Sequence, residues 1–391
     1  MATILLQAAG AAIGGALGPI GAAVGSAVGA LAGYAIDTAI INGMQRSEGP
    51  RRSGARPFSA EEGVAIPRVY GVARMGGLVI WTTRFEEARE TSRQGMKGPR
   101  VTEYSYFANI AFALCEGEIA GVRRIWADGK ELDQTLHEIR VHRGTEAQEP
   151  DPLIEARQGA GNAPAYRGTA YVVFERFPLA EYGNRIPQLQ FEVLRPVGEF
   201  YRRVKGVALI PGATEYGLSP TLVTREIKPG ETQALNRHVL CGATNFAAAL
   251  DELQMLCPNL EHIALVASWF GDDLRAGECR IRPMVTDNTS TGFSASWVVS
   301  GLARENALQV SYYDGGAAYG GTPSDKTIID AIAAIRARGL KVTLYPFIMM
   351  DVPPENTLPD PHGGTAQAPY PWRGRISCFP GPGQPGSADK T

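Results

Sequence analysis

The sequence predicts a multidomain α+β protein, because its pattern changes three times along 391 residues. Residues 1–44 are apolar and rich in Gly and Ala, and 45–57 form a linker rich in Gly, Pro and Ser. Residues 58–244 carry short segments with a period of two, which is typical of strands. Residues 245–391 contain strand, helix and strand in turn. We therefore predict a helical segment, a β-rich region and the beginning of an α/β domain.

The composition is that of a globular protein without a nucleic-acid-binding charge pattern. The hydrophobic fraction is 44% and the charged fraction is 20%, so the chain can bury real cores. A formal net charge of −2 argues against a protein that binds nucleic acid through a basic stripe. The one basic cluster, Arg46, Arg51, Arg52 and Arg56, lies in the linker. We interpret it as a solvated segment, and a phosphate or lipid-headgroup contact is the alternative.

Cysteine and histidine spacing predicts no metal site and no cofactor. The five cysteines form no C-x-x-C pair and are odd in number, so we expect reduced thiols, most of them buried. They are Cys115, Cys241, Cys257, Cys279 and Cys378. His137 and His142 are five residues apart, which does not place two ligands on one face of a helix. Reduced thiols suit assembly in a bacterial cytoplasm.

The first forty residues show a regular glycine spacing. No charged residue occurs between Ile4 and Ile36. Two sets of glycines are spaced four apart: Gly10, Gly14 and Gly18, and then Gly21, Gly25, Gly29 and Gly33. On a helix each set forms a groove without side chains, which lets a second helix backbone approach closely. Pro19 lies where the two sets change phase, so we predict two helices joined by a kink or turn.

Three interpretations of this segment remain open. It is a packed hairpin or oligomeric plug that can enter a membrane, a conventional membrane anchor, or a flexible leader. Glycine costs about 1 kcal/mol relative to alanine inside an exposed helix. We favour the packed plug because close contact between helices, or an apolar environment, must offset that cost. We therefore assign the seven glycines of the two sets as helix-contact or membrane-segment positions.

The region from 58 to about 200 is predicted to be mostly β. Residues 78–83 are rich in β-forming side chains, and 188–193 alternate strictly between apolar and polar. The even-numbered residues from Tyr104 to Leu114 form one apolar face, and 169–177 read as a further strand. Asp128-Gly129 indicates a tight turn. Residues 146–164 read as a loop.

Three segments of this region resemble the hub domains of siphophage tail-tip proteins. The first joins IPRVYG at 66–71 with RMGG at 74–77, and the second covers 106–129. The third and most specific runs from YRGTAYVVF at 166–174 through 183–187. The resemblance implies a β-rich hub, usually trimeric, which closes the tail tube and carries modules that contact the host or its wall.

The C-terminal half has the spacing of a βα repeat. Residues 246–256 have apolar residues at helical spacing, and 262–270 form a continuous apolar run typical of a buried strand. Residues 325–338 predict an amphipathic helix whose apolar face includes Ile329 and Ile335. A second buried strand is predicted over 340–351.

This half resembles the TIM-barrel-like domain of gene transfer agent baseplate proteins, which are multidomain tail-tip proteins of the megatron type. The resemblance covers roughly 245 to 380, including WFGDDLR at 269–275. A complete (β/α)₈ barrel takes about 250 residues, so we expect a partial barrel and a longer whole polypeptide.

Asp314 and Asp351 are weak candidates for catalysis. Asp351 ends a predicted strand, where barrel enzymes place catalytic groups, and Asp272, Asp273 and Asp314 are further acids near strand ends. A glycosidase needs two carboxyl groups about 5 to 9.5 Å apart. Acidic side chains in strand-end loops more often face water or accept capping hydrogen bonds from the backbone. We therefore expect no enzyme activity from this chain.

These observations predict a structural hub of a phage tail or gene transfer agent particle. The expected partners are other tail and baseplate proteins, two further copies in a homotrimer, the host envelope, and DNA that passes without sequence-specific binding. The expected location is the tail tip of a virion-like particle, where the chain contributes to envelope penetration and DNA delivery. A tail-associated glycan-binding or glycoside-hydrolase module is the main alternative, and a membrane-anchored β-rich envelope protein is a third.

Overall fold

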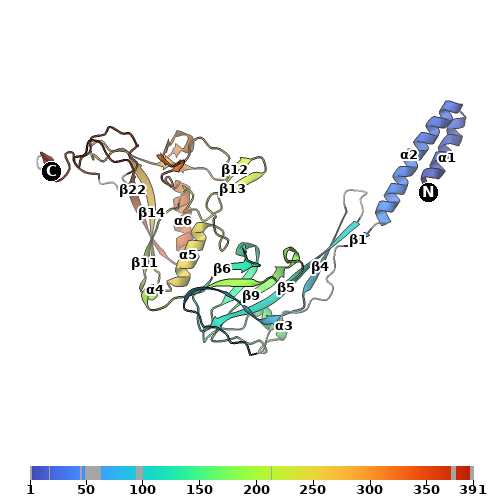
Figure 1. Cartoon of the computed structure of the whole chain (residues 1–391), viewed down its shortest axis with the longest axis horizontal. Coiled ribbons are helices and arrows are strands. Elements are labelled where there is room, and N and C mark those ends of the chain that lie inside the picture. Colours follow the sequence, from blue (N-terminus) through green and yellow to red (C-terminus); the bar gives the residue numbers. More distant parts are fainter. Residues whose placement is uncertain are drawn as a thin grey trace.

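Three parts follow one another in the computed structural model (Figure 1): a helical hairpin, a β body and an α/β part. The structure describes residues 2–16, 18–44, 46–48, 63–93, 100–212, 214–370 and 376–387. The hairpin stands away from the other two parts in Figure 1, and strand β4 lies on the side of the β body that faces it.

The hairpin consists of α1 (Ala2–Gly15) and α2 (Pro19–Met44). Gly18 has φ +88°, a conformation that favours glycine, and its carbonyl accepts the first bond of α2 from Ala22 at 3.0 Å. Pro19 is the first residue of α2, where the missing N–H has no helical partner to lose. The predicted break at Pro19 is confirmed.

Two sheets form the β body. The first has the order β1 (Arg46–Glu48), β5 (Arg100–Glu116), β9 (Thr169–Pro178), β8 (Glu138–His142), and β3 (Leu78–Thr82) and β4 (Glu86–Arg93) also pair with β5. The second has the order β2 (Gly71–Gly76), β10 (Leu189–Arg195), β6 (Gly121–Ala127), β7 (Lys130–Glu131). Asp128 and Gly129 form the β6–β7 turn with φ values of +49° and +84°, as their identities predict.

A shared core holds the two sheets together. The predicted apolar face of β5, from Tyr104 to Leu114, lies in this core with Phe174 of β9 and Phe191 of β10. From Asn109 to Cys115 the other face of β5 is also buried, since Ala111 packs with Ile154, Tyr171 and Val173. Burial of both faces explains why residues 108–115 are all buried.

The predicted loop at 146–164 is wrong in part, because it contains the helix α3 (Pro152–Gln158). Asp151 caps α3 by accepting hydrogen bonds from the N–H groups of Leu153 and Ile154 at 2.9 and 3.3 Å. Pro152 suits the first helical position. Pro152 therefore begins a helix, and Ile154 of that helix covers the outer face of β5 and β9.

The α/β part is built on three parallel strands, β11 (Gly206–Leu209), β14 (His262–Gly271) and β22 (Lys341–Met350), with β14 in the middle. Helices α5 (Asn245–Leu256) and α6 (Asp325–Ala337) cover one face of this sheet. Thr244 and Ser324 cap the two helices. The predicted helices and the buried strand β14 are confirmed. The second predicted strand forms as β22, but its predicted burial is wrong, because among the described strands β22 is an edge strand that pairs only with β14. The described residues contain no closed barrel.

Two further details of this part differ from the predictions. Strand β11 belongs to the parallel sheet although it lies before the predicted boundary at 245, because a four-residue strand has no clear pattern of its own. Ile329 is 64% exposed, whereas Ile335 is buried against the sheet. The helical period placed Ile329 on the apolar face, but that face is narrower than predicted.

Short elements complete the chain. They are α4 (Phe200–Arg203), η1 (Gln134–Leu136), η2 (Ala180–Tyr182), η3 (Arg304–Asn306), β12 (Thr224–Lys228), β13 (Glu231–Ala234), β15 (Ile281–Arg282), β16 (Met284–Val285), β17 (Val298–Val299), β18 (Leu302–Ala303), β19 (Leu308–Gln309), β20 (Tyr312–Tyr313) and β21 (Gly316–Ala317).

A β-bulge creates the joint between the β body and the α/β part. Two residues of β6, Arg123 and Arg124, lie opposite the single residue Glu192 of β10. Both guanidinium groups donate to the Glu192 carboxylate, at 2.8 and 3.0 Å through their Nε atoms. Arg123 also reaches Glu252 of α5 at 2.7 Å. Hydrogen bonds from Arg123, opposed by burial and helped by Arg124, lower the pKa of Glu192 to about 2.

We predict that Glu192→Gln lowers the free energy of unfolding by about 3 kcal/mol at pH 7, because two guanidinium groups lose their shared carboxylate. The pKa of Glu192 falls from 4.5 to about 2 on folding, so its contribution is complete above pH 4.5 and disappears as the pH falls through 2. Denaturant unfolding at several pH values should show the two proteins converging as the pH falls. Glu181→Gln, on an exposed turn, is the control. A difference in the free energy of unfolding between the two proteins that stays constant with pH would contradict this account.

Candidate functional site

The two helices of the hairpin meet backbone to backbone at three of the predicted glycines. A Cβ atom built on Gly10 would collide with the carbonyl oxygen of Gly25 and lie 3.4 Å from the Cα of Gly29. A Cβ atom on Gly29 would collide with the carbonyl oxygen of Leu6 and lie 3.1 Å from the Cα of Gln7. No side chain fits in either place unless the helices separate.

The structure does not show the other four predicted glycines in this backbone contact. Gly18 forms the turn, and Gly21 lines a groove between the helices. Gly14 and Gly33 belong to α1 and α2, but their surroundings lie outside the described residues. The four-residue spacing thus serves a contact within one chain at Gly10, Gly25 and Gly29.

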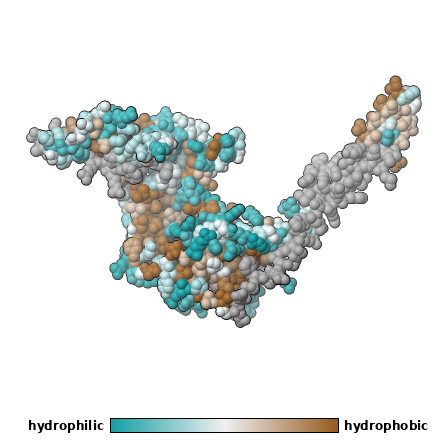
Figure 2. Space-filling view, viewed as in Figure 1, coloured by the Kyte–Doolittle hydropathy of each residue, from teal (hydrophilic) through white to brown (hydrophobic). Residues whose placement is uncertain are grey.

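The outside of the hairpin is apolar as well. Large aliphatic side chains with most of their surface exposed occur on both helices: Leu5, Ile13, Ile20, Val24, Val28 and Leu31. Figure 2 shows this hydrophobic surface near the tip of the hairpin. A groove between the helices is lined mainly by Gly, Ala, Val, Leu and Ile side chains. Among the described helices, none combines the length and the apolar character that crossing a bilayer requires.

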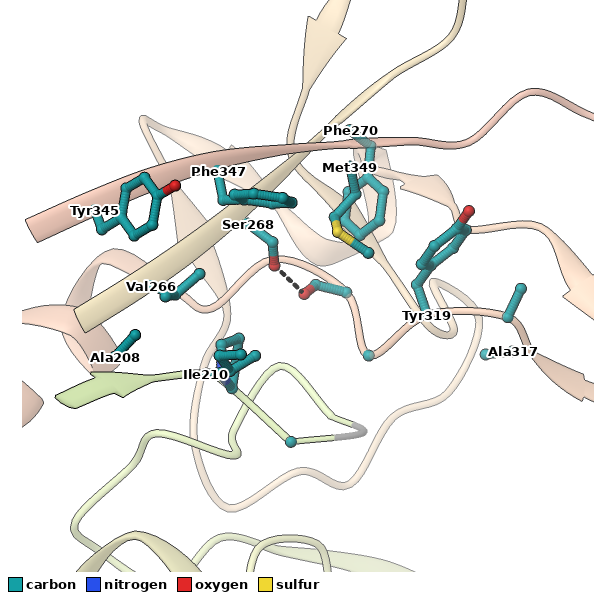
Figure 3. A pocket seen from close by; sticks show the side chains of 15 residues that line it. Ala208, Ile210, Val266, Ser268, Phe270, Ala317, Tyr319, Tyr345, Phe347 and Met349 are labelled. Carbon is teal, nitrogen blue, oxygen red and sulfur yellow. Dashed lines mark hydrogen bonds between the residues drawn. The ribbon is translucent and has the colours of Figure 1, made fainter. Parts of the chain in front are cut away.

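The face of the parallel sheet that α5 and α6 leave open forms a second apolar surface. Alternate residues of β14 and β22 point into one cavity of about 600 Å³ (Figure 3). Phe270, Phe347 and Met349 lie on its sheet side, and Tyr319 closes one end. The Ser268 hydroxyl donates to the carbonyl of Gly321 at 3.4 Å. The described lining contains no acidic or basic residue.

Asp351 and Asp314, the candidates for catalysis, are not among the residues that line this cavity. Asp351 follows β22 and is buried, and one of its carboxylate oxygens accepts the Ser311 N–H at 2.7 Å. The other oxygen is buried and has no hydrogen-bond partner among the described residues. Asp314 is exposed in the β20–β21 turn with φ +49°.

The neighbouring acids anchor loops. Asp273 accepts hydrogen bonds from Arg275 and from Gln367, at 2.7 Å each. Burial opposes its charged form, but these bonds outweigh that effect and lower the pKa of Asp273. Asp272 accepts the Arg280 N–H at 2.8 Å. Both carboxylates therefore stabilise the chain that follows β14.

Sequence reasoning missed a buried ion-pair cluster on the first sheet. Asp151 is completely buried and accepts hydrogen bonds from Arg140 at 2.8 Å and from the His142 ring at 2.9 Å. The His142 ring stacks on Tyr171 with centroids 4.2 Å apart. This cluster holds α3 against the sheet. The described part of the chain contains no group of three or more His, Cys, Asp or Glu residues able to hold a metal ion.

The chain is similar in sequence to a protein of a gene transfer agent virion. One chain of the solved structure "Virion of native gene transfer agent (GTA) particle" matches with 44% identity over 49% of this chain, with a TM-score of 0.30. The match covers 39% of that virion chain, so this chain spans about two fifths of its length. No family model matches the chain, and neither does any curated protein.

We predict that Gly29→Leu separates the hairpin helices, because the new side chain must displace the backbone at Leu6. Ala27→Leu places the same side chain at an exposed position of the same helix and should leave the contact intact. The distance between spin labels at residues 12 and 23 reports the separation. Equal distances in both variants would show that the glycine contact does not hold the hairpin together.

We also predict that Asp351→Asn destabilises the α/β part by about 1 to 3 kcal/mol, because a buried acceptor is weakened. Asp314→Asn should change stability by less than about 0.5 kcal/mol, since asparagine tolerates the positive φ of that turn. Thermal unfolding of the full chain measures both. Loss of glycan cleavage by particles carrying folded Asp351→Asn protein would instead assign Asp351 a catalytic role.

Proposed function

We propose that this chain is a structural component of a gene transfer agent or phage-like virion, and that it forms part of the hub at the tip of the tail. The observation that carries the proposal is the common core of the three hub-like segments. The segments at 66–77, 106–129 and 166–187 are far apart in sequence, yet each supplies side chains to the core between the two sheets. Met75, Ile125 and Phe174 are examples.

This arrangement supports a single hub unit. Resemblance in three separate segments has most weight when those segments build one folded body. The sequence identity of 44% to a virion chain agrees with this function at the level of the whole particle. Other virion proteins are then the expected partners, and the particle is the expected location.

The finer role that we propose is closure of the tail tube and its opening at the host envelope. Copies of the β body form a trimer around the tube axis, and their hairpins form a plug. The exposed aliphatic side chains of α1 and α2 support this role, because such a surface is unfavourable in water and needs a partner or an apolar phase. DNA then passes without sequence-specific contacts after the plug opens.

The cavity on the parallel sheet bears on the alternative function, binding or cleavage of host glycans. Aromatic side chains such as Tyr345 and Phe347 suit contact with sugar rings, but a hydrolase needs two carboxyl groups facing the bond that breaks. Since the described lining of the cavity contains no carboxyl group, we favour the structural role.

We expect the purified full chain to assemble as a trimer, and particles to carry it at the distal end of the tail. Native mass spectrometry gives the stoichiometry, and electron microscopy of particles with an affinity label on this chain gives the position. A label on the capsid or along the tail tube would contradict the tail-tip role. A chain that remains monomeric at every concentration would contradict the trimer.

A further inference from the structure

The outer face of the second sheet carries an open cluster of arginine and aromatic side chains. We call it the basic-aromatic face: Arg68, Tyr70, Val72, Arg74, Trp126 and Arg195. Tyr70 is 65% exposed and Val72 is 60% exposed, so no described element covers them. The Arg74 guanidinium lies 4.0 Å from the centre of the Trp126 ring. Arg195 lies 5.6 Å from the centre of the Tyr70 ring.

The positive charge of this face is only partly neutralised. Arg74 donates to the neutral side chain of Gln190 at 2.9 Å, and Arg195 donates to the backbone carbonyl of Glu116 at 2.7 Å. Among the described residues neither arginine has a carboxylate partner. Arg68 lies 3.8 Å from the carboxylate of Glu116. The face thus combines the exposed Tyr70, the half-buried Trp126 and two arginines without acidic partners among the described residues, and aromatic and arginine side chains dominate binding at protein interfaces.

Two acidic side chains lie opposite each other on the β4–β5 ribbon, which also contains Arg89, Arg93 and Arg100. Glu90 of β4 lies directly opposite Glu103 of β5, and both side chains are exposed. Like charges in directly opposed positions destabilise a strand pair. The described residues supply no cation to either glutamate, and β5 pairs with β4 alone over residues 103–106 among the described strands. A ribbon of two strands has little stability by itself, so a cation between the two glutamates would stabilise it.

We infer that the β4–β5 ribbon of one copy docks on the basic-aromatic face of the next copy. In this contact Arg74 of one copy lies between Glu90 and Glu103 of its neighbour. The inference rests on the proposed function, because it requires copies assembled around an axis. The two surfaces differ, so the contact is heterologous, and a heterologous contact closes a ring when its rotation suits a whole number of copies.

Figure 1 shows that the ribbon and strand β6 lie toward different parts of the same chain. The ribbon lies toward the helical hairpin, whereas β6 lies toward the α/β part, to which Arg123 and Glu252 join it. A nucleic acid suits this face less well. Trp126 is already flanked by Arg74 and Arg124, which leaves it little open ring surface for stacking with a base. The chain also has a formal net charge of −2.

A charge swap on the full chain tests the inference. Arg74→Glu should weaken self-association roughly tenfold or more, because it places a third acid beside Glu90 and Glu103. Combining Arg74→Glu with Glu90→Arg should restore much of the lost association. The matched control, Arg336→Glu, reverses an exposed charge on α6 and should have no effect. Analytical ultracentrifugation measures each association constant.

Disulfide trapping between copies checks the geometry. A mixture of Arg74→Cys and Glu90→Cys chains should yield a cross-linked pair under mild oxidation. Arg89→Cys replaces Glu90→Cys in the control, since Arg89 lies beside it on the opposite face of the ribbon. Cross-linking of the control pair to the same extent would overturn the inference.

The other outcomes separate this contact from the proposed function. If the unaltered chain assembles but Arg74→Glu does not weaken assembly, the ribbon contact is wrong and the hub remains. If the unaltered chain never associates, both fail. If Arg74→Glu leaves assembly intact but abolishes binding of a DNA duplex, the face binds nucleic acid and the inference is overturned.

Discussion

The position of the α/β part relative to the β body depends on the carboxylate of Glu192, which lies opposite a β-bulge and binds two arginines. Glu192 accepts hydrogen bonds from two consecutive arginines only because the bulge turns both toward the same face. Arg123 then extends to Glu252 of α5, while Met255 of α5 lies against Gly121, where a Cβ atom would be 2.6 Å from its sulfur. A second ion pair, Asp133 with Arg237, ties the two parts again at 2.6 Å. The joint therefore includes ion pairs together with the close contact between Met255 and Gly121.

Apolar surface that remains open lies at both ends of the chain. The hairpin exposes aliphatic side chains around a glycine contact, and the parallel sheet exposes the face opposite its helices. Parallel sheets are normally covered on both faces. The β body between them has a fully packed core. This distribution suits a component whose stable middle presents surfaces to other parts of an assembly.

Several elements were predictable because local chemistry determines them. Gly18 suits the turn, Pro19 suits the start of a helix, Asp128-Gly129 suits a two-residue hairpin, and the long apolar run of β14 is buried as expected. The similar run of β22 is largely exposed, because among the described strands it lies at the edge of the sheet. Helix α3 was missed because Asp151 and Pro152 are as common in loops as at a helix start. The ion-pair cluster of Asp151 was missed because Arg140 and His142 reach it only after β8 pairs with β9.

The sequence by itself determined the order of the three parts, the glycine spacing of the hairpin and the hub-like segments, since each depends on residues close together in the chain. The tertiary structure alone decided which glycines touch, which acids are buried, and that β11 joins the parallel sheet. It also decided that Glu90 opposes Glu103 and that Arg74 lies over Trp126. These contacts join residues from separate strands or helices. Their register follows from side-chain packing across the core, which no local pattern contains.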